Sequence, residues 1–226
     1  MRQIFLDTET TGLYPAQGHR IIEIAAIEMV NRRPTKNHFH VYLNPQRDID
    51  PAAQEVHGIT LEFLQDKPLF DSIAAELNDF VHDAELIIHN APFDVGFLNS
   101  ELGRIGLTPI EAICAKITDT LKMAKDSRPG QRNNLNALCS HFGIDNSRRT
   151  LHGALLDAEL LAEVYLAMTR GQDSLLIDLA YIPPAITQQT VFGRERNLKV
   201  LKADEAELLA HAEYLNSLAK AGAKSW

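Results

Sequence analysis

Cysteine is scarce in this chain of 226 residues, which contains only Cys114 and Cys139 and no CxxC motif. A disulfide framework and a thiolate zinc site both need more cysteine than this, so neither is expected. Both residues lie in apolar stretches of sequence. We therefore expect them to be reduced thiols in the core.

Long apolar runs are also missing, because no stretch approaches the roughly 18 residues needed to span a bilayer. The N-terminal residues read as a strand rather than as the basic and then apolar segment of a signal peptide. These absences predict a cytoplasmic protein without a membrane partner.

Positive charge is in deficit: 22 Lys and Arg stand against 30 Asp and Glu, a net charge of -8. Proteins that coat nucleic acid neutralise its phosphates with a basic surface, which this composition does not supply. Any contact with nucleic acid is therefore expected to be local, at a site filled by metal ions. The length and the 45% hydrophobic content suffice for one sizeable core and an appendage.

The first part of the chain reads as three strands joined by short turns. Apolar or alternating runs cover residues 3–6, 20–30 and 37–43, and Pro34, Pro45 and Pro51 mark the turns. These runs predict an antiparallel meander.

The apolar period then becomes helical. Helices are predicted at residues 70–81, 92–105, 119–124, 135–142 and 152–168, with short buried strands at 85–88 and 112–117. A meander followed by alternating helices and strands predicts an α/β fold, with a mixed five-stranded sheet flanked by helices on both faces.

After Gly171 the composition changes, which predicts an N-terminal domain over residues 1–171. Residues 172–203 lack periodicity and read as a flexible linker. A helix restarts at Asp204, which forms a capping pattern with Glu207 and leads the segment 204–226. Its apolar residues share one face, so it either folds back on the main domain or docks on a partner.

Two carboxylates, Asp7 and Glu9, follow the first strand two residues apart. Side chains at this spacing on a strand point to the same face, so both can reach one hard cation such as Mg²⁺ or Mn²⁺. The stretch up to Gly12 reads as a tight turn whose backbone N–H groups can meet a phosphate or a sugar. A plain acidic turn is the alternative.

Two further acids and a histidine extend this pair. Asp94 is expected in the first turn of a helix, where the helix dipole alone favours an acid. Asp157 lies between Leu156 and Ala158, where a carboxylate is costly unless it faces solvent or a cation. His152 falls at or before the start of the same helix, as a base or as a structural histidine.

Four carboxylates in one cleft raise one another's pKa values, and divalent cations relieve this repulsion. Two such ions, about 3.5–4 Å apart, stabilise the attacking and leaving oxygens of a phosphoryl displacement. A histidine with a pKa near neutrality can take the proton from the attacking water. The set predicts a metal-dependent phosphoryl displacement whose catalytic residues are Asp7, Glu9, Asp94, His152 and Asp157.

The pattern Asp7-x-Glu9, Asp94 and His152-x4-Asp157 resembles the DEDDh 3′→5′ exonucleases, which have a ribonuclease-H-like core. The resemblance covers about residues 2–171. Longer shared stretches are more closely similar to the proofreading subunits of bacterial replicative DNA polymerases; they lie at residues 6–12, 56–59, 89–94 and 149–158. The resemblance implies removal of mismatched nucleotides, as 5′-monophosphates, from single-stranded or frayed 3′ DNA ends.

The resemblance also implies roles for single residues. Asp7, Glu9 and Asp157 would bind one metal ion, Asp7 would bridge to a second ion supported by Asp94, and His152 would be the general base. The substrate would be contacted by Thr8, Thr10, Thr11, Gly12, His57, His89, Asn90 and Phe93. Two of these have other interpretations: Phe93 fits a core position and Asn90 fits a helix cap. His57 is expected in a glycine-containing loop with no clear structural duty, which favours a functional role.

The appendage resembles the partner-binding parts of the same proteins. Gln172 with Leu175, Leu176 and Ile177 is similar to short motifs that bind the sliding clamp, although a helix exit is the alternative. The tail would dock on the polymerase catalytic subunit through Leu208, Leu209 and Leu215, and its tether would let weak contacts suffice. A small accessory subunit stays open as a further partner.

Two other functions stay open. A DEDDh exoribonuclease or oligonucleotide-trimming enzyme would share the core motifs, but the linker and terminal helix argue against it. A replisome protein that only joins polymerase to clamp would not need the five catalytic residues, which are all present.

Overall fold

The computed structural model describes residues 1–149, 151–170 and 204–220, with side chains described up to residue 216 in the last range. Contacts divide the chain into two units, one holding the described residues up to 170 and the other holding residues 204–220. The linker predicted over residues 172–203 lies outside the described residues. Gln172, Leu175, Leu176 and Ile177 lie there too.

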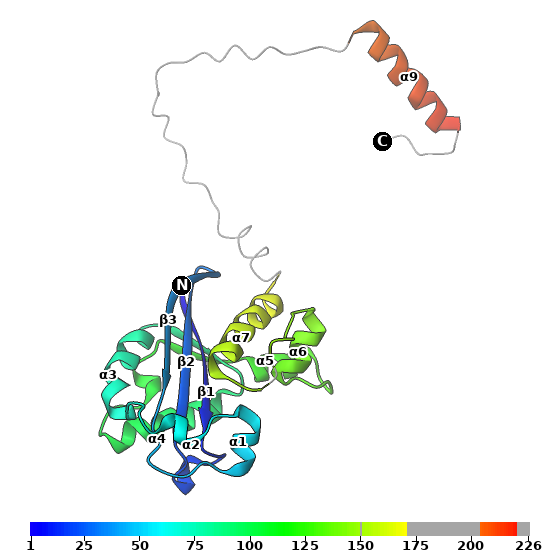
Figure 1. Ribbon diagram of the computed structural model, residues 1–226. Coiled ribbons are helices and arrows are strands. Elements are labelled where there is room, and N and C mark those ends of the chain that lie inside the picture. The colour runs from blue at the N-terminus through cyan, green and yellow to red at the C-terminus, as the bar shows by residue number, and fades with distance from the viewer. Residues whose placement is uncertain (150, 171–203, 221–226) are drawn as a thin grey trace, which may run out of the picture. The chain divides into compact units, whose positions relative to one another are not determined.

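A five-stranded mixed sheet forms the centre of the larger unit (Figure 1). Its strand order is β3-β2-β1-β4-β5, from β1 (Arg2–Thr10), β2 (Ile21–Val30), β3 (Arg33–Tyr42), β4 (Glu85–Ile88) and β5 (Lys116–Asp119). β1, β2 and β3 pair antiparallel, whereas β1 pairs parallel with β4 and β4 with β5. The predicted meander and mixed sheet are confirmed.

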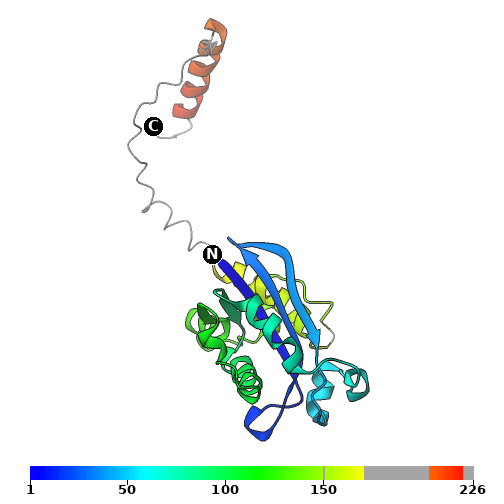
Figure 2. The same ribbon diagram turned by 90° about the vertical axis from the view of Figure 1, so that its left-hand side faces the viewer.

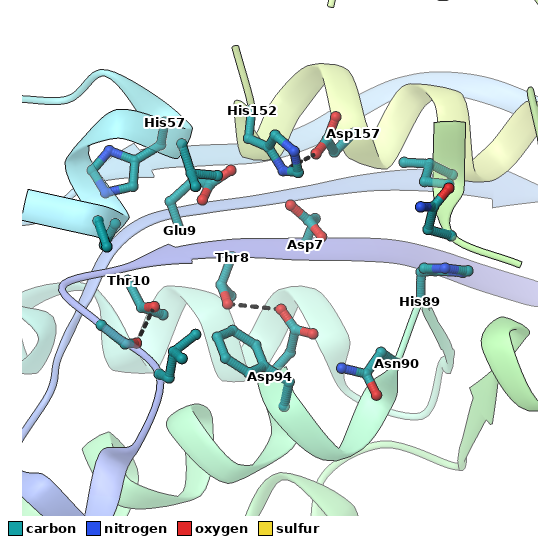
Figure 3. A pocket seen from close by; sticks show the side chains of 18 of the residues that line it. Asp7, Thr8, Glu9, Thr10, His57, His89, Asn90, Asp94, His152 and Asp157 are labelled. Atoms are coloured by element: carbon teal, nitrogen blue, oxygen red, sulfur yellow. Dashed lines mark hydrogen bonds and ion pairs between the residues drawn. The ribbon is translucent and has the colours of Figure 1, made fainter. Parts of the chain in front are cut away.

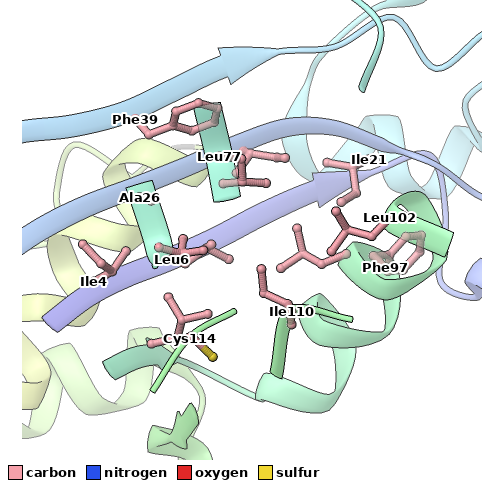
Figure 4. Packing of buried hydrophobic residues seen from close by; sticks show 14 of the residues in the cluster. Ile4, Leu6, Ile21, Ala26, Phe39, Leu77, Phe97, Leu102, Ile110 and Cys114 are labelled. Carbon is pink, nitrogen blue, oxygen red and sulfur yellow. The ribbon is translucent and has the colours of Figure 1, made fainter. Parts of the chain in front are cut away.

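Helices cover both faces of the sheet. Successive residues of β1 point to opposite faces, and its apolar side chains on each face are buried under helices. Ile4 and Leu6 pack in a core with α3 (Phe70–Val81) and α4 (Ala91–Arg104), part of which Figure 4 shows. Phe5 packs in a second core with α5 (Thr120–Ser127), α6 (Leu135–Phe142) and α7 (Ala154–Met168). Figures 1 and 2 show α3 and α7 on opposite sides of the sheet.

Both cysteines are free and buried, as predicted. Cys114 belongs to the core beneath α3 and α4, and Cys139 belongs to the core beneath α7. Burial raises the pKa of both thiols, which favours the unreactive protonated form.

Two short helices were not predicted: α1 (Pro51–His57) and α2 (Leu61–Leu64). The prediction of a turn at Pro51 was wrong, because this proline occupies the first position of α1, where its fixed φ suits a helix. The strand predicted at 112–117 was also misplaced. Ile110–Ala112 is a 3₁₀ turn, labelled η2, and β5 starts only at Lys116; an apolar run alone does not separate these structures.

In the smaller unit, α9 (Glu205–Lys220) begins with the predicted capping pair. The Glu207 N–H donates to Asp204 Oδ1 at 2.8 Å, and the Asp204 N–H donates to Glu207 Oε2 at 3.1 Å. Its leucines at positions 208, 209 and 215 are more than half exposed. Within the described residues, no helix combines the length and apolar character needed to cross a membrane.

Candidate active site

A cavity of about 810 Å³ opens at the carboxyl ends of β1 and β4. Parallel strands end at the same edge of a sheet, so loops and helix starts that follow them meet there. All of the predicted catalytic and substrate-contacting residues line this cavity except Thr11. The sequence motifs thus converge on one place, drawn in Figure 3.

The strand β1 carries Asp7 and Glu9 on the face that α7 covers, and Asp157 projects from the first turn of α7 (Figure 3). The pair lies within β1, which runs on to Thr10, rather than after a strand that ends at residue 6. The pairing of β1 with β2 shifts register between Glu9 and Thr10. This irregularity is typical of strands that aim side chains into a site.

Asp94 approaches from the opposite side of β1, from the first turn of α4, and is only 3% exposed. The Thr8 hydroxyl, between the two acids of β1, donates to Asp94 Oδ1 at 2.7 Å (Figure 3). The Thr8 hydroxyl therefore holds Asp94, and Thr8 also lines the cavity, where its contact with substrate stays a prediction. A side chain facing away from the Asp7–Glu9 pair thus joins α4 to the site.

Burial of the acidic side chains dominates the electrostatics. It raises the pKa of Asp7 well above its ordinary value, with further increases from Asp94, Asp157 and Glu9. The pKa of Glu9 rises to about 8, first through burial and then through Asp157. Burial also raises the pKa of Asp94 to about 7, although the hydrogen bond from Thr8 opposes the rise.

This donor set fits hard divalent cations, whose preferred protein ligands are carboxylate oxygens. Ligand atoms of Glu9, His152 and Asp157 lie within 4.8 Å of one another. A cation would stabilise the ionised carboxylates that burial disfavours.

Arg149 is a residue of the site to which the sequence assigned no role. Within the described part of the chain, it is the only Lys or Arg that lines the cavity. Its Nη2 donates to Asp157 Oδ2 at 2.6 Å and to His152 Nδ1 at 2.9 Å, and its Nε donates to Asp157 Oδ1. Its only signal in the sequence was its place at the start of the shared stretch 149–158.

His152 lies just before α7, which begins at Ala154, and its side chain is 46% exposed. Its backbone N–H donates to the carbonyl of Val56, near the end of α1. Burial and the neighbouring Arg149 lower the pKa of His152, while Asp157 opposes the decrease. The imidazole is therefore neutral at pH 7, as a general base must be.

Two other histidines point a nitrogen into buried space without a hydrogen-bond partner among the described residues: His57 Nε2 and His89 Nε2. His57 ends α1 rather than lying in a loop, and Gly58 follows with φ 72°. The N–H of Ile59 donates to His57 Nδ1 at 3.0 Å, so the neutral ring carries its proton on Nε2. A weak hydrogen-bond interaction with the Thr10 backbone opposes the lowering of the pKa of His57 by burial, which places the ring beside the loop after β1.

The loop after β1 is held by its own side chains. The Thr10 hydroxyl donates to the Gly12 carbonyl at 2.7 Å, and the Thr11 hydroxyl lies 3.1 Å from His19 Nδ1. A Cβ on Gly12 would lie 2.3 Å from His19 Cε1, so only glycine fits. Since both hydroxyls are engaged, the loop presents mainly its backbone to the cavity.

Asn90 and Phe93 line the cavity at the start of α4, where each also has a structural interpretation. Asn90 is the N-cap of α4 with φ 69°, but its side chain makes no capping hydrogen bond. Phe93 is half-buried, lies 5.0 Å from the Phe97 ring and also lines the cavity. It therefore serves the core and the cavity wall together.

Comparison with protein families follows the same lines. A family model described as exonuclease matches residues 4–165, the segment that contains the sheet and all five predicted catalytic residues. The chain belongs to the exonuclease family. The resemblance inferred from the catalytic pattern is confirmed, and members of this family depend on divalent metal.

Close relatives within the exonuclease family are DNA polymerase III epsilon subunits. That of Pasteurella multocida is 51% identical, over 97% of this chain and 90% of its own. The epsilon subunit of Escherichia coli K12 is 48% identical, over 98% and 95% of the two chains. The match extends through nearly the whole length, beyond the exonuclease core.

Solved structures agree on the fold. Exonuclease X, in complex with 5′ overhanging duplex DNA, superposes with a TM-score of 0.57 at 24% identity, covering 74% of this chain and 90% of that one. A full-length 3′-exonuclease gives 0.64 at 18% identity, with coverage of 76% and 61%. The expected ribonuclease-H-like architecture is confirmed.

The free energy of unfolding of the metal-free exonuclease is expected to fall as pH rises from about 5 to 9. The pKa values of about 8 for Glu9 and about 7 for Asp94 exceed their ordinary values, so the folded state retains protons that the unfolded chain has lost. This stabilisation is complete below the ordinary pKa and disappears as pH passes the folded value. Thermal unfolding in chelator measures the decline, and saturating Mg²⁺ should reduce it. Stability in chelator that rises over this range would contradict the buried acid cluster.

Proposed function

We propose that this exonuclease proofreads for a bacterial replicative DNA polymerase, removing mismatched 3′-terminal nucleotides as 5′-monophosphates. The observation that carries the proposal is the convergence of acids from β1, α4 and α7 with His152 in one cavity. The epsilon-subunit relatives, matched over nearly the whole chain, supply the polymerase context. Replication in bacteria would place the protein in the cytoplasm.

The acids would hold two divalent cations, Mg²⁺ or Mn²⁺. Asp7, Glu9 and Asp157 would bind one ion, with Asp7 shared with a second ion that Asp94 supports. When bound, the ions stabilise charge on the attacking and leaving oxygens of the phosphate. Thr8 fixes the orientation of Asp94 through the hydrogen bond described above.

His152 would take the proton from the attacking water. Its lowered pKa keeps the imidazole neutral near pH 7, and its exposed position leaves the ring accessible to solvent. The carbonyl of Val56 holds the backbone of His152, which links the base to α1.

The terminal nucleotide would lie in the cavity, against the lining residues other than the acids. His57 Nε2 and His89 Nε2 line this part of the cavity, and each is a buried nitrogen without a hydrogen bond of ordinary geometry to the described residues. Phe93 offers a ring for stacking, and the backbone of Thr10 to Gly12 can meet the sugar. Exposed Leu13 and Val56 supply apolar surface at the rim.

Selection of mismatched ends needs no reading of bases. A terminal nucleotide must leave its partner strand to enter the cavity, and a mismatched end separates at lower cost. The net charge of -8 agrees with a site that grips one strand end rather than a duplex.

The decisive experiment compares hydrolysis of paired, mismatched and single-stranded 3′ DNA ends with RNA of the same sequence, in Mg²⁺ and in Mn²⁺. We expect single-stranded and mismatched DNA to be shortened faster than paired DNA, with nucleoside 5′-monophosphates as products. A strong preference for RNA would instead favour the exoribonuclease alternative. Adding the polymerase subunit then tests whether mismatch removal accelerates in the complex.

We further propose the division into an exonuclease domain (residues 1–171), a linker (172–203) and a polymerase-binding segment (204–226). The apolar side chains of Leu208, Leu209 and Leu215 support docking of α9, because each is exposed. The motif of Gln172, Leu175, Leu176 and Ile177 would bind the sliding clamp. A small accessory subunit would be a further partner of the core.

Deletion of residues 204–226 is expected to abolish association with the polymerase subunit and to leave hydrolysis of single-stranded DNA within about twofold, because the catalytic residues lie in the other unit. Size-exclusion chromatography and a single-strand assay measure the two effects. A matched control replaces only Leu208 and Leu209 by serine, which should weaken association without shortening the chain. Co-elution of the truncated protein with polymerase would refute the docking assignment.

A further inference from the structure

We propose that Arg149 is an internal counter-cation that holds Asp157 and His152 in the metal-free enzyme and withdraws when a divalent cation takes Asp157. The inference rests on the proposed metal site. Arg149 alone would then control the change from the metal-free site, in which it holds Asp157 and His152, to the metal-bound site.

The contacts of Arg149 are extensive for a residue at the mouth of a cavity. Its side chain is 6% exposed, and it makes a two-pronged pair with Asp157, itself buried in α7. Nη1 donates to Asn136 Oδ1 at 2.9 Å, which ties the arginine to α6. Four hydrogen bonds thus fix the guanidinium between α6 and α7.

The charge of Arg149 reaches beyond Asp157 to the two acids of β1. It lowers the pKa values of Asp7 and Glu9 against the larger effect of burial. In the metal-free protein it therefore supplies part of the positive charge that the acids need. A divalent cation would supply more positive charge than the guanidinium does.

The arginine and a cation at Asp157 compete for the same oxygens. Both Oδ1 and Oδ2 of Asp157 accept from Arg149, so one of the two lone pairs on each oxygen is already engaged when a cation approaches. It would also lie next to a positive guanidinium, which repels it. Binding of a cation through Asp157 therefore favours release of Arg149.

The same contact blocks the base. Arg149 Nη2 always donates, so His152 Nδ1 must accept, and the neutral imidazole then carries its proton on Nε2. Neither nitrogen has a lone pair available to water in this arrangement. Withdrawal of Arg149 would free Asp157 for the cation and Nδ1 of His152 for a change of tautomer, so one movement prepares both groups.

The test measures Mn²⁺ binding by calorimetry with the full chain, without DNA. In Arg149→Gln the competing cation is removed, and we expect Mn²⁺ to bind about tenfold more tightly, within the usual range for coupled sites. Arg149→Lys keeps a charge but loses the two-pronged geometry, so its affinity should lie between the two. Arg148→Gln is the matched control, because it removes the same charge from an adjacent, 78% exposed side chain and should change affinity less than twofold.

A second measurement uses the unaltered protein, in case the substitution prevents folding. The Nε–H resonance of Arg149 should exchange slowly with solvent in chelator and lose that protection as Mg²⁺ is added. Unchanged or weaker Mn²⁺ binding by Arg149→Gln, or a protected Nε–H at saturating Mg²⁺, would overturn the inference. Absence of Mn²⁺ binding by the unaltered protein would instead refute the metal site of the proposed function.

Discussion

Replacing Asp7 by asparagine is expected to lower the rate of DNA hydrolysis by at least ~10³-fold. Asp7 is the acid whose pKa responds to Asp94, Asp157 and Glu9 together, so it lies electrostatically at the centre of the set. If Asp7 is shared by two ions as proposed, its loss would remove about 4 kcal/mol or more of transition-state stabilisation. Single-turnover hydrolysis of a single-stranded oligonucleotide measures the effect.

Asparagine keeps the shape of Asp7, and removing a buried acid should raise the melting temperature in chelator rather than lower it. Inactivity combined with undiminished thermal stability would therefore separate chemistry from folding. Asp71→Asn, at an exposed acid in the first turn of α3, is the matched control and should keep full activity. Hydrolysis retained in Asp7→Asn would contradict the metal assignment. It would also leave room for a replisome protein that only joins polymerase to clamp.

Replacing His152 by glutamine is expected to reduce the rate by about 10²–10⁴-fold, the usual contribution of a general base. The unaltered enzyme should lose activity as pH falls through the lowered pKa of His152, because the protonated imidazole accepts no proton. Glutamine does not titrate, so this acidic limb should disappear in the variant. The measurement is the pH dependence of single-turnover hydrolysis at saturating metal.

A matched control is His38→Gln, which changes an exposed histidine of β3 outside the cavity. It should retain both the rate and the pH profile. An unchanged acidic limb in His152→Gln would remove His152 as the base. In that outcome the contact from Arg149 to Nδ1 would have a purely structural role.

The sheet, and the acids and histidine that gather in the cavity, could be predicted because they depend on local patterns. Alternation along residues 37–43, most of which lie in β3, and the helical period of α3 describe how single elements bury apolar side chains. Asp157 stood out because a carboxylate between apolar residues is costly unless it faces solvent or a cation, and Asp7 and Glu9 stood out by their spacing on a strand. These signals survive without knowledge of the three-dimensional contacts.

What the sequence did not predict depends on contacts between distant segments. The hydrogen bond from Thr8 to Asp94 joins residues 86 positions apart, and that from Arg149 to Asp157 crosses the turn before α7. The helix ending at His57 was missed because seven residues are too few to establish a period. In each case the partner chosen in space decided the role of the residue.

The strand β1 has a further consequence, because its alternating side chains belong to two separate hydrophobic layers. Leu6 is packed under α4 and Phe5 under α7, and these two helices supply Asp94 and Asp157. The distance between Asp94 and Asp157 therefore depends on how closely α4 packs on one face of the sheet and how closely α7 packs on the other. A cavity opened in either layer, far from DNA, would shift one wall of the site against the other. Copying accuracy would then become temperature-sensitive in variants whose altered residue touches neither metal nor nucleotide.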